Sequence, residues 1–215
     1  KAGEWQAYLQ MLFERTREEP NMANLHELGV AMLLASDTLK AERLLSAALE
    51  APKADEGKGQ AIMRQVSIRF ARGIVYQELR DYSSAAEDFE TALNCLSNAI
   101  AVDAEPLKNV LSRPLPKLTR SECLNSWGYA TFLKALYEVM QADDYTVGSE
   151  SLQRSKSSVQ RISEARSLLE EATEHFDAAI KATEGDPQGM FYFNRGKAKY
   201  FRALLSSMHN GEADF

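Results

Sequence analysis

The residues of this chain that could carry metal or phosphate chemistry are few and lie far apart. His26, His175 and His209 show neither the i, i+4 pairing nor the neighbouring cysteines that a zinc site uses. The segment EGKGQ lacks the preceding strand and the Ser or Thr after lysine that a phosphate-binding loop requires. We therefore expect neither a metal site nor a nucleotide cofactor.

The acidic pairs are the next candidates for chemistry. Glu87-Asp88 and Glu170-Glu171 fall on the polar faces of expected helices. A catalytic carboxylate needs a water-poor cleft that shifts its pKa, and no pattern singles one out here. Neither a G-x-S-x-G elbow nor a Cys-His nucleophile signature occurs. The sequence thus predicts a non-enzymatic protein with no catalytic residues.

One basic cluster remains, in the segment NRGKAKYFR. Helical spacing places Arg195, Lys199 and Arg202 on one face, where they either form a solvated surface or contact an anion or carboxylate. The whole chain has a net charge of −6 and a pI near 5.3. Because nucleic-acid binders usually present a basic stripe, this charge argues against a nucleic-acid partner.

The elements that position these residues are helices in a repeated pattern. Small and aromatic residues recur at offsets of three and four, so that they share one face of each of two helices joined by a tight turn. In one segment these residues are Gly73, Tyr76, Tyr82, Ala85, Phe89 and Ala92, and in an upstream segment they are Gly29, Met32, Ala41, Leu45, Ala48 and Pro52. Small residues let paired helices approach closely, and the large side chains fill the space between them.

These two segments resemble tetratricopeptide repeats, a family of stacked helix-turn-helix units of about 34 residues. A third unit is split, with Trp127-Gly128 in its first helix and Ala172, Phe176, Ala179 and Pro187 far downstream. A fourth first helix follows around Gly196. The glycines are spaced more widely than the family repeat, which places extra residues in longer helices or inserted loops.

The resemblance implies an all-α fold, an α-solenoid of three to four stacked antiparallel hairpins in a single domain, 1–215. Its expected parts are a capping helix at 1–20, repeat 1 at 22–52, repeat 2 at 60–100, repeat 3 at 118–187 with an inserted loop at 141–158, and a C-terminal helix at 190–210. We expect tight turns at 36–38 and 81–82, a proline-rich loop at 103–116, and a cap near Ser163 for the helix after the inserted loop. Whether the two loops are functional or disordered stays open.

In this family the first helices of successive hairpins line a concave groove that holds a peptide or helix of a partner protein. The corresponding partner-binding residues of this chain are His26, Val30, Leu33, Phe70, Ile74, Gln77, Asn125, Tyr129 and Phe132. Some family members clamp chaperone C-terminal tails with Lys, Asn and Arg. His26, Val30 and Ala71 stand on that surface here, which argues against chaperone-tail binding.

The function expected from the resemblance is therefore a scaffold or adaptor for protein–protein interaction. The alternative is an architectural subunit of a large multiprotein assembly. Cys95 and Cys123 lie in apolar helical contexts and favour a reducing compartment, so we expect a cytoplasmic protein, or one of an organelle matrix or stroma after removal of a targeting peptide. No run approaches the ~20 apolar residues of a membrane span.

Overall fold

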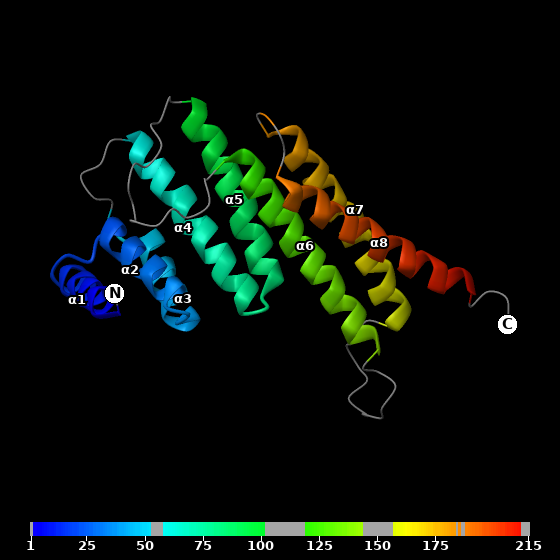
Figure 1. Cartoon of the computed structure of the whole chain (residues 1–215), viewed down its shortest axis with the longest axis horizontal. Helices are drawn as coiled ribbons and strands as arrows, with labels where there is room; N and C mark the ends of the chain where they lie inside the picture. The colour runs from blue at the N-terminus through cyan, green and yellow to red at the C-terminus, as the bar shows by residue number, and fades with distance from the viewer. Residues whose placement is uncertain are drawn as a thin grey trace. The chain divides into compact units, whose positions relative to one another are not determined.

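The chain folds into α-helices, and the described part of it contains no strand. The structure, a computed structural model, describes residues 2–52, 58–101, 119–143, 157–183, 185 and 188–211. It confirms the predicted all-α class. The chain divides into two compact units, Lys1–Thr119 and Arg120–Phe215, which are described separately below (Figure 1).

The first unit consists of five helices that pack in chain order. They are α1 (Ala2–Glu18), α2 (Met22–Leu34), α3 (Thr38–Glu50), α4 (Lys58–Glu78) and α5 (Tyr82–Ala101). Each helix contacts the next, and the α2–α3 and α4–α5 pairs form antiparallel hairpins, as Figure 1 shows. α4 also contacts α2, so the first helices of the two hairpins are neighbours.

The turns of the two hairpins are built in the same way. The amide of Asp37 donates to the carbonyl of Met32 at 3.0 Å, and the amide of Asp81 donates to that of Tyr76 at 2.9 Å. The residue before each aspartate, Ser36 or Arg80, has a left-handed backbone with φ of 61° or 62°. This is the bonding pattern of a Schellman motif. Both hairpins have the predicted tight turn, but the turns span 35–37 and 79–81, one and two residues earlier than the predicted 36–38 and 81–82.

Each aspartate then caps the start of the second helix of its hairpin. Asp37 accepts a hydrogen bond from the amide of Lys40, and Asp81 accepts one from the amide of Ser84. A side chain that takes up an orphan amide in this way stabilises the start of a helix. The two hairpins therefore agree in their caps as well as in their turns.

Glycine lies where the two helices of each hairpin cross. A Cβ added at Gly29 would lie 2.8 Å from Leu45, and one added at Gly73 would lie 2.8 Å from the Phe89 ring. Both distances are far below van der Waals contact, so only glycine leaves room for the large side chain opposite. The predicted close approach of the helices at Gly29 and Gly73 is confirmed.

Around these crossings lies a continuous core. Buried alanines flank the large side chain of each second helix, namely Ala41 and Ala48 around Leu45, and Ala85 and Ala92 around Phe89. α4 packs on the first hairpin through another set of buried residues, Ile68, Ala71 and Val75. At the other end of the unit, α1 covers α2 with the fully buried Leu12.

The second unit repeats this arrangement with three helices. They are α6 (Arg120–Asp143), α7 (Ser158–Lys181) and α8 (Gly189–Gly211). α6 packs on α7 and α7 on α8. A Cβ added at Gly128 would lie 2.9 Å from the ring of Phe176, which is flanked by the buried Ala172 and Ala179. The split third hairpin therefore closes as predicted, although its helices are far apart in sequence.

The boundaries of the inserted loop differ from the prediction. Gln141 to Asp143 belong to α6, and α7 begins at Ser158 with Ser157 as its cap, in place of Ser163. Ser157 accepts from the amide of Gln160 while the Gln160 side chain accepts from the amide of Ser157, a reciprocal capping box. The rest of this loop, 144–156, and the proline-rich loop, 103–116, lie outside the described residues.

Candidate partner-binding faces

Several residues predicted to bind a partner are buried between helices. Val30, Phe70 and Phe132 have almost no exposed surface. Phe70 meets the ring of Phe89 edge-on with 5.3 Å between centroids, and Phe132 belongs to the core of the second unit. In this structure these side chains hold helices together and cannot touch a bound protein.

His26, another predicted contact, is also fully buried. Its Nε2 lies 3.0 Å from the hydroxyl of Ser67, which joins α2 to α4, the first helices of successive hairpins. Burial, and secondarily the positive charge of Arg64, lowers the pKa of His26 to about 3. The imidazole is therefore neutral at physiological pH and serves to align two helices.

Asn125 makes a similar link in the second unit. Its side-chain oxygen accepts a hydrogen bond from Asn194 at 3.2 Å, which connects α6 to α8. His26 and Asn125 each lie three residues before the glycine of their own helix. In both units, this position joins one first helix to the next.

The predicted residues that retain exposed surface are fewer. Leu33, Ile74 and Gln77 are partly exposed in the first unit, and Asn125 and Tyr129 are partly exposed in the second. Ile74 and Tyr129 each directly follow the glycine of their helix, so they occupy the same position in α4 and α6. This set is the accessible remainder of the predicted binding surface.

A cation held by aromatic rings lies beside Tyr129. The Lys197 Nζ of α8 is 5.8 Å from the centroid of the Tyr129 ring, 5.5 Å from that of Phe132 and 5.1 Å from that of Phe193. Lys197 itself directly follows Gly196, the position that Ile74 and Tyr129 occupy in their helices. Cation–π attraction of this kind orients the ammonium group. Lys197 was not predicted as a binding residue. Its position directly after Gly196, which matches Ile74 and Tyr129, could have indicated it.

The predicted anion-binding cluster is largely neutralised by the chain itself. Arg195 forms an ion pair with Asp177 at 2.8 Å, and Arg202 forms one with Glu170 at 3.2 Å. Both carboxylates belong to α7, so these pairs fasten α8 to its neighbour. Lys199 is exposed. These two ion pairs thus serve the packing of α8 on α7.

A buried charge network was not predicted from the sequence. The carboxylate of Asp88 in α5 accepts two bonds from Arg72 at 2.7 and 2.8 Å and one from Arg69 at 3.3 Å. Arg72 also donates to the Ser46 hydroxyl of α3 at 3.0 Å. The hydrogen bonds to Asp88 raise the pKa of Arg72. The network joins α3, α4 and α5. In the sequence, the presence of Arg69 and Arg72 on an otherwise apolar helix face could have indicated it.

The remaining candidates for chemistry are inert or isolated. Burial raises the pKa of the Cys123 thiol to about 12, so it stays protonated. His175 stacks on Trp127 with ring centroids 3.8 Å apart. Within the described residues, no three His, Cys, Asp or Glu side chains are placed to hold a metal ion.

Two further results concern the chain as a whole. No helix in the described ranges combines the length and apolarity needed to cross a membrane. Comparison of the chain with protein-family models, curated proteins and solved structures gave no match.

Proposed function

We propose that this chain is a non-enzymatic scaffold that binds a peptide or helix of a partner protein on the first helices of its hairpins. The proposed architecture is an α-solenoid of the tetratricopeptide-repeat type. This architecture is supported by a helix crossing that occurs three times. At each crossing a glycine, Gly29, Gly73 or Gly128, faces a large side chain that lies between two alanines of the other helix.

The observation that carries the proposal is the contact between successive first helices in both units. α2 meets α4 through His26 and Ser67, and α6 meets α8 through Asn125 and Asn194. Helices aligned in this way present a continuous row of side chains to a ligand. An extended peptide or a helix fits such a row better than a small molecule does.

Each unit has one such row of exposed side chains on its first helices, and the two rows differ in chemistry. In the first unit the row is formed by Leu33, Ile74 and Gln77, which suits an apolar segment with one polar anchor. In the second unit Tyr129 and Lys197 lie together, which suits an aromatic or acidic residue. Tyrosine is among the residues that contribute most to binding energy at protein interfaces.

A site-specific photo-crosslinker tests the proposal. The photoreactive residue benzoylphenylalanine replaces Ile74 or Tyr129 in the full chain, and control chains carry it at the exposed Glu90 of α5 or Glu174 of α7. In extract from the native source, we expect discrete adducts at 74 and 129 that the controls lack. Equal crosslinking at all four positions, or none at 74 and 129, would reject these rows as the binding surface.

A further inference from the structure

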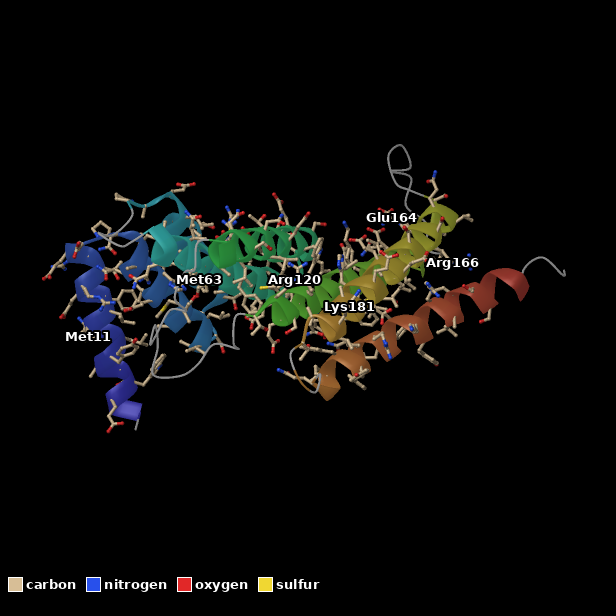
Figure 2. All side chains as sticks on the ribbon, turned by 90° about the horizontal axis from the view of Figure 1, so that it is seen from above. Met11, Met63, Arg120, Glu164, Arg166 and Lys181 are labelled. Atoms are coloured by element: carbon tan, nitrogen blue, oxygen red, sulfur yellow. The ribbon has the colours of Figure 1, made fainter. Side chains whose placement is uncertain are left out.

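α8 presents a large apolar face that no described helix of the second unit covers. Among the described residues, α8 packs on α7 and, to a small extent, on α6. Its opposite side carries strongly exposed side chains, with Met190 57%, Phe193 60% and Tyr200 65% exposed. In Figure 2, no helix of the second unit lies on the side of α8 that points away from α7.

α8 repeats α4 when the two helices are aligned on Gly196 and Gly73. The alignment matches the buried Phe191 and Ala198 of α8 to Ile68 and Val75, the residues through which α4 packs on the preceding hairpin. α8 accordingly uses the same side to pack on the preceding helix pair. α8 therefore corresponds to the first helix of a fourth hairpin.

The side of α4 that carries Phe70 and Gly73 is covered by α5, whereas no described helix covers the matching side of α8. In α4, Phe70 and Gly73 meet the Phe89 ring of the second helix α5. The same alignment places the exposed Phe193 at the position of Phe70. No described atom lies within 4 Å of a Cβ added at Gly196. Among the described residues, no side chain thus fills the space on α8 that Leu45, Phe89 and Phe176 fill in the other hairpins.

Charge indicates what fits this face. α8 has four lysine and arginine residues and no acidic residue, whereas α5, which covers α4, has three acidic residues and neither lysine nor arginine. Arg195 corresponds to Arg72, and it bonds to Asp177 of α7 as Arg72 bonds to Ser46 of α3. Arg72 makes its other bonds to Asp88, the residue before Phe89. Arg195 is placed to receive an acidic residue in the same way.

We infer that the face of α8 around Phe193, Gly196 and Tyr200 binds an acidic amphipathic helix of a partner protein. This helix carries Asp or Glu directly before a Phe or Leu, with Ala four positions before and three positions after the large residue. The large side chain enters the space at Gly196, and the carboxylate reaches Arg195. The helix thereby completes the fourth hairpin. Phe193 of this face lies against Lys197 of the second row. The two proposals have separate tests, crosslinking at 74 and 129 for the rows and peptide binding at Gly196 for this face, so either can fail alone.

A synthetic peptide that copies α5 tests the inference. The fluorescein-labelled peptide 82–101 is titrated with the full chain, and its anisotropy is recorded. We expect saturable binding that Gly196→Leu weakens at least tenfold, because leucine fills the space on α8. Arg195→Gln should weaken binding about fivefold. The same peptide with Phe89→Ala should bind at least tenfold more weakly to the unchanged chain.

The control variant is Gly3→Leu, since a Cβ at Gly3 also meets nothing within 4 Å but lies on α1. It should bind the peptide as the unchanged chain does, and thermal melts should show both variants folded. Two results would overturn the inference. One is peptide binding that is absent or insensitive to Gly196→Leu. The other is dimerisation of the chain in sedimentation that Gly196→Leu abolishes, which would assign the face to a second copy.

Discussion

A Cβ on Gly73 would lie 2.8 Å from the Phe89 ring, although these residues belong to different helices. Phe89 has no exposed surface and also contacts Phe70 edge-on, so its ring has little freedom to move aside. The crossing of α4 and α5 thus depends on two residues, a glycine on α4 that has no side chain and a phenylalanine on α5 whose ring fills the space. The same relationship joins Gly29 to Leu45 and Gly128 to Phe176.

Gly73→Ala should therefore destabilise the protein. Overpacking a well-filled core costs about 1–3 kcal/mol, which exceeds the gain of up to about 1 kcal/mol in helix propensity. The matched control is Gly196→Ala, where nothing lies within 4 Å of the added methyl group and only the propensity gain applies. Urea denaturation should give free energies of unfolding that change in opposite directions. A change of the same sign and size in both variants would contradict the assigned crossing.

The two hairpin turns should gain stability from glycine. Ser36 and Arg80 have left-handed backbones, in which a residue with a Cβ is strained by about 1 kcal/mol relative to glycine. Ser36→Gly and Arg80→Gly should each raise the free energy of unfolding by up to that amount. Ala35→Gly is the control, because Ala35 has a φ of −84° and gains nothing from glycine. A loss of stability in all three variants would show that the turns do not hold this conformation.

Loss of the buried carboxylate of Asp88 should weaken the joining of three helices. Asp88→Asn leaves Arg72 partly buried without a full counter-charge, and breaking such a pair costs about 3–5 kcal/mol. Glu90→Gln removes a charge from an exposed position of the same helix and should change stability by less than about 0.5 kcal/mol. Chemical denaturation measures both. Equal, small effects would mean that Asp88 is solvated.

The buried His26 should make the fold sensitive to acid. Its pKa is about 3 in the folded state and about 6.5 in the unfolded chain, so between these values only the unfolded chain binds the proton. Stability should thus be unaffected by this group above pH 6.5 and fall by about 1.4 kcal/mol per pH unit below it, down to about pH 3. His26→Gln keeps a polar group near Ser67 but cannot titrate.

The measurement is the free energy of unfolding of both proteins at pH 7.5, 6 and 5. The slope below pH 6.5 should be shallower for His26→Gln, while other acid-sensitive groups contribute equally to both proteins. Parallel curves would show that His26 is solvated or protonated in the folded state.

The two cysteines should react at different rates. Cys123 is buried with its pKa raised to about 12, whereas Cys95 is partly exposed. Because the thiolate is the reactive form, iodoacetamide at pH 8 should modify Cys95 first and Cys123 only after unfolding in urea. Mass spectrometry of peptides from the labelled protein distinguishes them. Rapid native labelling of Cys123 would place it at the surface.

The pairing of helices was predictable from sequence, and the exposure of their faces was not. Gly29, Gly73 and Gly128, with a large residue between two alanines downstream, identified each crossing, since only close approach of helices explains this pattern. This pattern of glycine, alanine and large residues identifies only one packing face of each helix. α2 packs on α1, α3 and α4 at once, so Val30 and His26 are buried although they lie off the marked face. An apolar sequence on nearly every side of α2 was the available signal.

The contact of Gly128 with Phe176 shows where the pairing of α6 and α7 is encoded. A tight turn joins α4 to α5, whereas 14 residues separate Asp143 from Ser158, yet the crossing is the same. The alignment of the two helices therefore resides in their side chains and does not depend on the length of the connection. Doubling the number of residues between two helices adds only about 0.6 kcal/mol to the entropic cost of closing the loop. A tag or domain inserted between α6 and α7 should therefore cost the protein little stability.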